Sequence, residues 1–378
     1  MSNILLTVFS VLAGAVLGVV ATKIDYYIKK KKIKKRNERS MRFLPYYNPL
    51  QDEIILLRQW NSKDILDERN IKIIYDESRS YDLVAPEIHC EFITNPDEWE
   101  KIYAAELKKE KKKTGVVSFV TSLSLDHKDT IQGKELRIVV SSCDYLAHHV
   151  NSKYFVKYPN DWTRIKQTIK NGELDAYFCQ AMPGNVFVNF IVINGQTNNV
   201  LAIRRSNQEL NARNIWGLGG FETMNDIKNA PNGAEELNLK GIVYRGLREE
   251  LALTREEVSE MAISSLSFVK HLGIMVTALV RVDLMGAEED ISKTGESALT
   301  ESGFIERVLS QSESNFEHSC LNWLPIKLKE MKEFIEHDTG FYKEEIQKYD
   351  MKEAKWIGYV KLQMYQIWRN HDSIGITL

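Results

Sequence analysis

One stretch of the sequence decides the fold: Arg245-Gly246-Leu247-Arg248-Glu249-Glu250-Leu251-Ala252-Leu253. Two adjacent carboxylates, Glu249 and Glu250, repel each other in a helix and cannot both be buried without a counter-charge. Arg245 lies one helical turn before Glu249, a spacing that lets the two side chains pair. Leu247 and Leu251 share a helix face and would pack on a sheet. The stretch therefore predicts an amphipathic helix that presents carboxylates beside a basic residue.

A glycine-rich segment precedes this helix in the chain: Trp216-Gly217-Leu218-Gly219-Gly220-Phe221-Glu222. Three glycines in four positions indicate backbone in unusual conformations, or backbone that another group approaches closely. Upstream, the β-prone runs 186–193 and 200–205 flank the turn-rich stretch 194–199, which predicts a hairpin. We expect the helix to run from about Leu239 to Leu253. The predicted order is hairpin, glycine loop and carboxylate helix.

Carboxylates beside a glycine-rich loop suit a phosphorylated ligand with Mg²⁺, because hard cations prefer oxygen ligands and share them with phosphates. The alternative is a solvent-exposed helix whose charges pair one turn apart, and the nine residues alone leave it open. Trp216 and Phe221 are close enough to the loop to stack on a base, although aromatics of this kind are more often part of a core.

The order of these elements resembles the Nudix hydrolase family, whose signature is G-x5-E-x7-R-E-u-x-E-E-x-G-u, where u is aliphatic. Five of the seven specified positions at the helix end match: Arg245, Leu247, Glu249, Glu250 and Leu253. Gly246 and Ala252 do not match. Leu218-Gly219-Gly220 is similar to the Pro-Gly-Gly of the family without its proline. The resemblance covers roughly Gly184 to Leu324.

Two departures from the signature concern the loop and the first glutamate. The gap from Gly220 to Arg245 exceeds the family spacing by about ten residues, which predicts an insertion within 223–238. The signature's early glutamate falls on Leu237, and Glu235 or Glu236 could replace it after a shift.

The resemblance implies roles for particular residues. The implied catalytic residues are Arg245, Glu249 and Glu250; the implied Mg²⁺ ligands are Glu249 and Glu250; the implied ligand-binding residues are Trp216, Gly219 and Gly220. Gly246 stands where the family has a metal-binding glutamate, so one carboxylate is absent, and a distant one such as Glu296 or Glu301 would have to complete the site. Losing such a ligand commonly costs orders of magnitude in rate. An active enzyme would be an Mg²⁺-dependent pyrophosphohydrolase.

The N-terminus carries a different signal. Residues 4–22 contain no charge, and a helix of that length spans about 28 Å, close to the hydrocarbon core of a bilayer. A lysine-rich block follows within 23–36, which predicts that the N-terminus lies outside an inner membrane and the body in the cytoplasm. Gly14 and Gly18 form a small-xxx-small pattern that favours self-association of spanning helices into a homo-oligomer.

We predict an α+β fold: a single transmembrane helix, then a Nudix-like α/β/α sandwich with an extra N-terminal α+β region and C-terminal helices. The predicted segments are a transmembrane helix (1–22), a basic juxtamembrane linker (23–40), an α+β region (41–181), the Nudix-like domain (182–335) and a C-terminal helical segment (336–378). Within the α+β region, 54–60 and 99–109 are predicted to be helices and 71–75 a strand. Within the C-terminal segment, 342–370 is predicted to be helical, and Trp356, Val360, Met364 and Ile367 form an apolar stripe along it.

The arrangement resembles one subgroup of Nudix-domain proteins, the membrane effectors encoded beside cyclic-oligonucleotide-making nucleotidyltransferases in bacterial anti-phage systems (CBASS). That resemblance implies that the domain senses a cyclic nucleotide and triggers membrane damage. The alternatives are a membrane-tethered hydrolase of nucleoside diphosphate derivatives and a tethered scaffold. The net charge of −2, with 27% charged residues, argues against a general nucleic-acid partner.

Overall fold

The computed structural model describes part of the 378-residue chain: residues 54–59, 71–75, 93–109, 116–125, 136–170, 186–205, 215–225, 227, 238–269, 273–285, 299–311, 318–337, 356 and 359–376. The chain separates into two units, Met1–Gln51 and Asp52–Leu378. All the described residues belong to the second unit.

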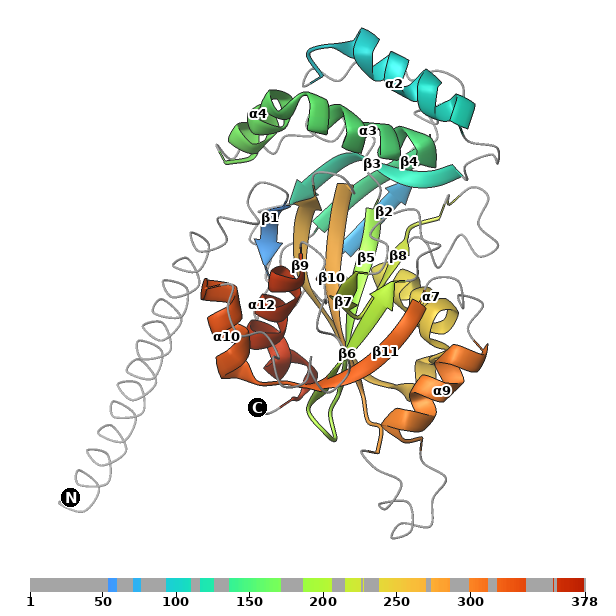
Figure 1. Ribbon diagram of the computed structural model, residues 1–378, viewed down its shortest axis with the longest axis vertical. Coiled ribbons are helices and arrows are strands. Elements are labelled where there is room, and N and C mark those ends of the chain that lie inside the picture. The colour runs from blue at the N-terminus through green and yellow to red at the C-terminus, as the bar shows by residue number, and fades with distance from the viewer. Residues whose placement is uncertain are drawn as a thin grey trace, which may run out of the picture. The chain divides into compact units, whose positions relative to one another are not determined.

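An eight-stranded mixed sheet forms the centre of this unit (Figure 1). Its main path runs β1-β9-β10-β5-β6-β11, while β7 pairs with β6 and β8 with β5. The strands are β1 Ile54–Gln59, β5 Val186–Asn194, β6 Asn199–Arg205, β7 Trp216–Leu218, β8 Gly220–Thr223, β9 Val258–Val269, β10 Gly273–Val282 and β11 His318–Pro325. The predicted hairpin is confirmed by β5 and β6, which are antiparallel and joined through Asn194 and Asn199.

Strand composition explains the position of the two central strands. β5 (Val-Phe-Val-Asn-Phe-Ile-Val-Ile-Asn) is buried along its whole length, and β10 is buried at all but one position. The two run parallel, with Val186 to Asn194 opposite Ile274 to Val282. Such continuous apolar runs, rather than alternating ones, are typical of strands covered on both faces.

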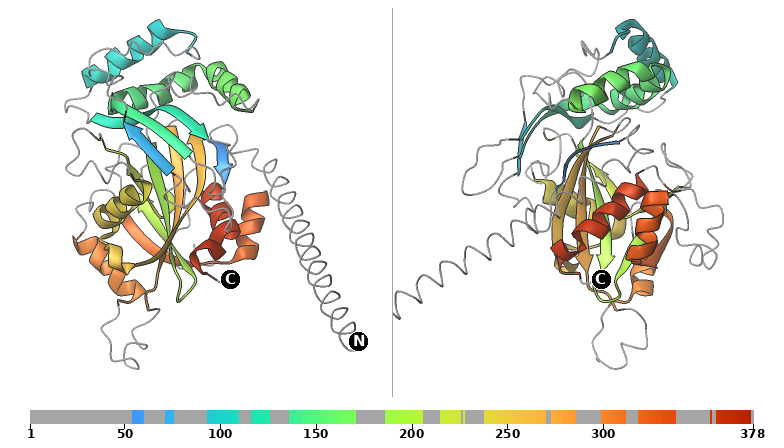
Figure 2. Two further views of the ribbon diagram at one scale, coloured as in Figure 1. Left: turned by 180° about the vertical axis from the view of Figure 1, so that it is seen from behind. Right: turned by 90° about the vertical axis from the view of Figure 1, so that its left-hand side faces the viewer.

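Helices cover both faces of the sheet, as the opposite views in Figures 1 and 2 show. One layer holds α7 (Leu239–Leu251) and α9 (Glu301–Gln311); the other holds α10 (Leu328–His337) and α12 (Val360–Asn370). On the α7 side the sheet contributes Val186, Val188 and Phe190 to the main apolar core. On the α12 side lies a row of polar side chains in register across three adjacent strands, Ser265 of β9, Thr277 of β10 and Asn189 of β5, all 0% exposed.

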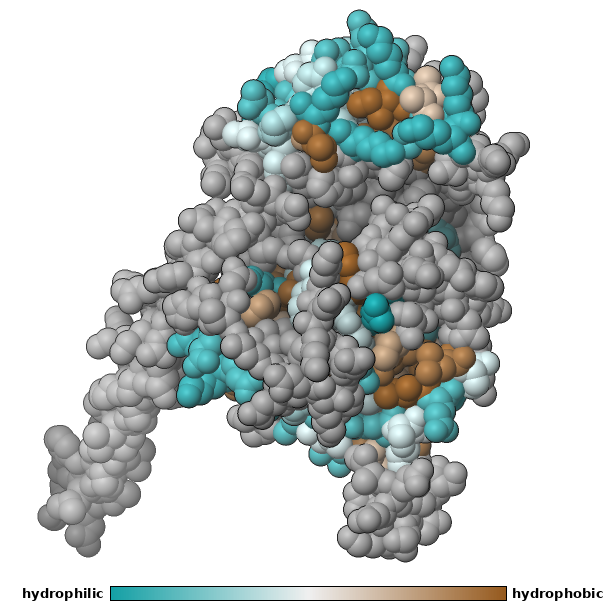
Figure 3. Space-filling view, in the orientation of Figure 1, coloured by the Kyte–Doolittle hydropathy of each residue, from teal (hydrophilic) through white to brown (hydrophobic). Residues whose placement is uncertain are grey.

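A separate three-stranded sheet has the order β2-β4-β3, with β2 Ile71–Tyr75, β3 Val116–Leu125 and β4 Leu136–Asp144. Three helices accompany it: α2 Pro96–Lys109, α3 Tyr145–Lys157 and α4 Pro159–Lys170. The buried Asp161 of α4 accepts hydrogen bonds from the Tyr154 hydroxyl (2.7 Å) and from the Thr94 amide and hydroxyl (3.0 Å each), which fixes α3 and α4 against the start of α2. The surface over α2 is mostly hydrophilic in Figure 3, with isolated apolar side chains.

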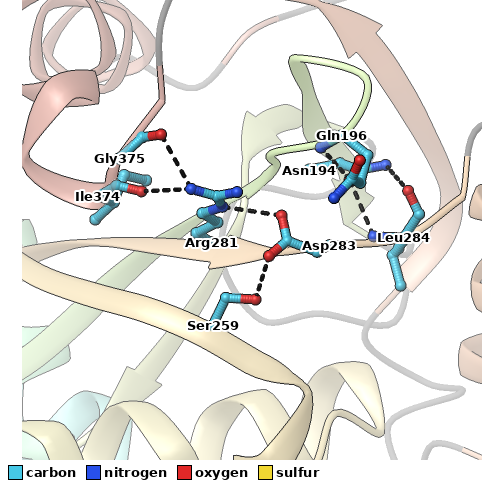
Figure 4. Close-up of polar contacts among 8 residues, drawn as sticks. All are labelled: Asn194, Gln196, Ser259, Arg281, Asp283, Leu284, Ile374 and Gly375. Carbon is cyan, nitrogen blue, oxygen red and sulfur yellow. Dashed lines mark hydrogen bonds and ion pairs between the residues drawn. The ribbon is translucent and has the colours of Figure 1, made fainter.

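The last described residues return to the large sheet. In Figure 4 the guanidinium of Arg281, on β10, faces the carbonyls of Ile374 and Gly375 on one side and the Asp283 carboxylate on the other. Its Nη1 donates to the Gly375 carbonyl (3.0 Å), and its Nε lies 2.9 Å from Asp283 Oδ1. The Ser259 hydroxyl of β9 donates to the other carboxylate oxygen, Asp283 Oδ2, at 2.6 Å. The segment after α12 is therefore tied to β10 by a charge-assisted contact.

Two predicted elements differ from the structure. Residues 54–59 form strand β1, not a helix, because they pair antiparallel with β9 at the edge of the sheet. In the C-terminal segment the helix begins only at Val360; Trp356 forms an isolated parallel bridge with Trp216 instead of helix. Residues 342–355 lie outside the described part of the chain. The helix predicted at 99–109 and the strand at 71–75 are confirmed.

The predicted fold class also needs a correction. Among the residues that the structure describes, no helix is long and apolar enough to cross a membrane. The fold that the structure supports is α+β with a mixed sheet, and the predicted single transmembrane helix is not supported. Residues 1–22, where that helix is predicted, lie outside the described residues, as do Gly14, Gly18 and the basic block. Association through the two glycines and inner-membrane localisation therefore stay predictions.

Candidate functional site

The glycine loop lies between two short strands, β7 and β8, that pair with the hairpin strands β6 and β5. Gly219 connects them with a φ of +74°, a conformation that favours glycine, and a Cβ at this position would lie 1.8 Å from the Phe190 carbonyl oxygen. At Gly220 a Cβ would lie 2.4 Å from Glu250 Oε2. Both glycines are therefore required by close packing against β5 and α7.

Helix α7 brings the carboxylate stretch to this loop. Asn238 caps the N-terminus, where its side chain accepts a hydrogen bond from the Lys240 amide at 2.9 Å. At the other end Ala252 adopts a left-handed conformation (φ 50°), and its amide donates to the Arg248 carbonyl. The helix buries Leu247 and Leu251, both 0% exposed, against the sheet. The predicted amphipathic helix is confirmed.

Arg245 and Glu222 form the central ion pair of the site. Arg245 is 7% exposed; its Nη1 lies 2.8 Å from Glu222 Oε1, and its Nη2 donates to the Thr223 carbonyl at 2.8 Å. Burial raises the pKa of Glu222 to about 8, because desolvation outweighs the opposing effect of Arg245, and repulsion from Glu250 and Glu249 adds to it. The family signature places its first glutamate at Leu237, with Glu235 or Glu236 as replacements after a shift. These three residues lie outside the described part of the chain.

The two adjacent glutamates of α7 lie in different environments. Glu250 is 5% exposed and points toward the loop, where its Oε2 lies 3.4 Å from the Phe221 amide nitrogen. The Glu249 side chain is 44% exposed and lies 3.6 Å from both Arg245 Nη1 and Arg248 Nη2. The structure therefore brings Gly219, Gly220, Arg245 and Glu250 together and leaves Glu249 at the solvent edge.

Gly246 lies at a position where neighbouring side chains leave no space for a Cβ atom. A Cβ at this position would lie 2.7 Å from Glu222 Cβ and 2.7 Å from Phe190 Cε1, inside the distances that real side chains adopt. The Glu222 side chain and the Phe190 ring thus fill the space in which a glutamate at 246 would have to begin.

Trp216, predicted to bind ligand, is buried against the C-terminal segment. It is 5% exposed, and its ring centroid lies 6.3 Å from that of Trp356. Next to it, Tyr359 packs edge-on against Phe221 at 5.0 Å, and burial raises the pKa of the Tyr359 phenol. The aromatic residues around the loop therefore contact each other and the segment that leads into α12.

The residues present do not fit the Mg²⁺ site implied by the sequence. Glu222 is paired with Arg245, Glu250 faces a backbone amide, and position 246 admits no side chain. Within the described residues no group of three or more His, Cys, Asp or Glu side chains could hold a metal ion. Glu301, suggested as a distant ligand, accepts hydrogen bonds from Asn194, Thr197 and Asn199 of the hairpin turn. Glu296 lies outside the described part of the chain.

One further residue near the loop was not predicted. Gln363 of α12, 0% exposed, accepts a hydrogen bond from the Leu218 amide (3.0 Å) and donates to the Leu218 carbonyl (2.8 Å) and to Asn189 Oδ1 (3.2 Å). Asn189 in turn donates to the Gly220 carbonyl at 3.0 Å. Sequence separation hides this contact, because Gln363 lies 145 residues after Leu218.

No protein-family model matches the sequence, and no curated protein matches it. Among solved structures, the chain is similar to DR0079 from Deinococcus radiodurans (12% identity, TM-score 0.28, covering 49% of this chain and 83% of the other). It is also similar to Shewanella oneidensis NrtR (15% identity, TM-score 0.25, 48% and 61%) and to the same protein complexed with a 27mer DNA (15% identity, TM-score 0.22, 48% and 59%). DR0079 and NrtR have the Nudix fold.

At these identities and TM-scores the neighbours do not indicate what this chain does. The hairpin, glycine loop and helix that the family resemblance predicted are present in that order, which is consistent with a Nudix-like domain. Nothing in the structure supports the predicted absence of a nucleic-acid partner, which stays a prediction.

Proposed function

We propose that the Nudix-like domain binds a nucleotide at the Gly219–Gly220 loop and does not hydrolyse it. The observation that carries this proposal is the state of the carboxylates: Glu222 is paired with Arg245, and Glu250 faces the Phe221 amide. Position 246 has no room for a third carboxylate. Metal-assisted hydrolysis needs carboxylates free to hold cations, whereas binding needs only donors and positive charge.

Positive charge lies close to the loop. Arg205 ends β6, and its guanidinium carbon lies 6.0 Å from the centre of the Phe221 ring, directly after Gly220 in the chain. Guanidinium groups bind phosphate oxygens with two parallel hydrogen bonds. Arg205 therefore favours an anionic ligand at this end of the sheet.

In the setting implied by the resemblance, the ligand is a cyclic nucleotide made during infection in a CBASS anti-phage system. A cyclic dinucleotide has phosphodiester groups but no pyrophosphate, so a domain that only binds it does not need the metal-dependent chemistry of a hydrolase. The absent carboxylate at Gly246 supports a sensor more than an enzyme.

The test uses the full-length chain. Calorimetric titration with cyclic di-AMP, cyclic di-GMP, cyclic GMP–AMP and ADP-ribose is expected to give micromolar or tighter binding of at least one cyclic dinucleotide. Incubation of the same ligands with Mg²⁺ or Mn²⁺ is expected to leave them intact. Arg205→Ala should weaken binding at least tenfold, while Arg248→Ala, which removes an exposed arginine of α7, should not.

Two results would contradict the proposal. Turnover of ADP-ribose or another nucleoside diphosphate derivative that Glu250→Gln abolishes would establish a hydrolase. If none of the four ligands binds, the proposal of nucleotide binding is wrong, and a scaffold role is favoured.

A further inference from the structure

The C-terminal segment contacts the glycine loop at three successive points. Trp356 forms a parallel bridge with Trp216 of β7, Tyr359 packs on Phe221 of β8, and Gln363 bonds to Leu218 between them. The contacts thus follow the loop from one strand to the next.

The Gln363 side chain pairs with the Leu218 backbone in the way that a neighbouring β-strand would. Its amide bonds to both the N–H and the C=O of Leu218, at 3.0 and 2.8 Å. Two hydrogen bonds in this fixed geometry define where the Leu218 peptide lies, because an amide side chain in a closed packing site has few other positions.

A second contact holds the other side of the loop. Gln363 Nε2 also lies 3.2 Å from Asn189 Oδ1, and Asn189 Nδ2 donates to the Gly220 carbonyl at 3.0 Å. Gly219, with its φ of +74°, therefore lies between two peptides that the same pair of amides holds. Both Gln363 and Asn189 are 0% exposed, so water does not compete for these bonds.

We infer that Gln363 is a positioning residue, which fixes the conformation of the Gly219–Gly220 loop from the C-terminal helix and so sets the affinity of the loop for its ligand. Gln363 acts through the loop and does not itself contact the ligand. The effect on affinity rests on the proposed function, whereas the effect on the loop does not.

Helix α12 offers a matched control. Gln366 lies one turn further along the same helix and is also 0% exposed, but its amide oxygen accepts a hydrogen bond from Asn370 of the same helix. Gln363→Met and Gln366→Met both replace a buried amide with an apolar side chain of similar length. Only the first removes bonds to the loop.

The experiment measures amide hydrogen exchange by mass spectrometry on the full-length chain, together with calorimetric titration with cyclic di-AMP, cyclic di-GMP and cyclic GMP–AMP. Gln363→Met is expected to speed exchange in peptides covering 216–222 at least tenfold and to weaken binding at least tenfold. Gln366→Met is expected to leave both quantities within about threefold of the wild type. A global loss of structure would instead speed exchange across all the strands in both variants.

The two readouts separate the inference from the proposed function. Unchanged exchange at 216–222 in Gln363→Met would overturn the positioning role whatever the ligand does. Faster exchange there with unchanged affinity for a cyclic dinucleotide that binds the wild type would overturn the effect on binding. If the wild type binds none of the three ligands, the proposed function fails, and the exchange result alone decides whether Gln363 positions the loop.

Discussion

The face of the large sheet beneath α7 is apolar, whereas the face beneath α12 carries buried polar side chains. Against α7 the sheet places Val188 and Phe190, which belong to the same apolar core as Leu247 and Leu251. Against α12 it places a row formed by Asn189, Thr277 and Ser265. Apolar burial is strong but non-directional, while hydrogen bonds are weaker in net energy and define position. Helix α12 also buries apolar side chains such as Leu362, Met364 and Ile367, so both helices stabilise the domain. Only α12 adds buried hydrogen bonds that define the geometry of the loop.

The largest effect is expected on the apolar face. Leu247→Ala removes a fully buried side chain from the packing of α7 and should lower the free energy of unfolding by about 2–5 kcal/mol. Chemical denaturation monitored by circular dichroism measures this change. Arg248→Ala, on the exposed side of the same helix, should change it by less than about 0.5 kcal/mol. Equal effects of the two substitutions would mean that α7 is not packed as described.

The ion pair at the edge of α7 should make stability depend on pH. The pKa of Glu222 is raised to about 8 in the folded protein, above its unfolded value of 4.5, so this group stabilises the fold fully below about pH 4.5. That contribution is lost as the pH rises through 8. Glu222→Gln should therefore flatten the fall in stability between pH 5 and pH 8, with a difference of more than about 1 kcal/mol at pH 8.

The check is a series of denaturation curves at fixed ionic strength from pH 5 to pH 8 for both proteins. If the free energy of unfolding changes with pH in the same way in the wild type and in Glu222→Gln, the pairing with Arg245 outweighs the burial of Glu222.

A smaller gain is expected at the end of α7. Ala252 adopts φ 50°, a left-handed conformation that costs an alanine about 1–2 kcal/mol, whereas glycine adopts it freely. Ala252→Gly should raise the melting temperature, with a net stabilisation of about 0.5–1 kcal/mol after the greater chain entropy of glycine in the unfolded state is included. Ala262→Gly, in strand β9, is the opposite control and should destabilise. A loss of stability in Ala252→Gly would show that the strain is absent.

The smallest effect is expected on the polar face. The Thr277 hydroxyl is buried and has no hydrogen-bond partner among the residues that the structure describes. Thr277→Val keeps the shape and removes an unpaired polar group, so the free energy of unfolding should stay the same or rise by up to about 1 kcal/mol. Thr277→Ser keeps the hydroxyl, loses a methyl group and should destabilise by about 0.8 kcal/mol. A loss of more than about 1 kcal/mol in Thr277→Val would show that the hydroxyl is hydrogen-bonded.

The elements around the glycine loop could be predicted because their signals are local. The 186–205 hairpin and the periodic pattern of α7 both fall within short windows of sequence. The strand at 54–59 was predicted wrongly because a short apolar run fits a helix or a strand equally well. Its pairing with β9, about 200 residues away, decided the outcome.

The partners within the site could not be read from spacing. Arg245 and Glu222 are 23 residues apart, and the family spacing pointed instead to Leu237, Glu235 or Glu236. Gln363 belongs to the helix that carries the predicted apolar stripe, but it lies between the stripe positions. The stripe therefore did not predict that this amide is buried and bonded to Leu218. The anchor, the Mg²⁺ site and the glycine-mediated oligomer were inferred from motifs, and of these the Mg²⁺ site does not fit the residues that the structure brings together.

The crowding at Gly246 limits how this domain could be engineered. A single exchange to glutamate would place its first side-chain carbon against Glu222 and Phe190, so it would disturb the Arg245 pair before it could bind a cation. Conversion to a working hydrolase would need a smaller residue at 222, a new partner for the arginine and a repacked ring at 190. These changes are linked because they concern groups in contact with one another, so they would have to accompany the exchange at 246 rather than follow it one by one.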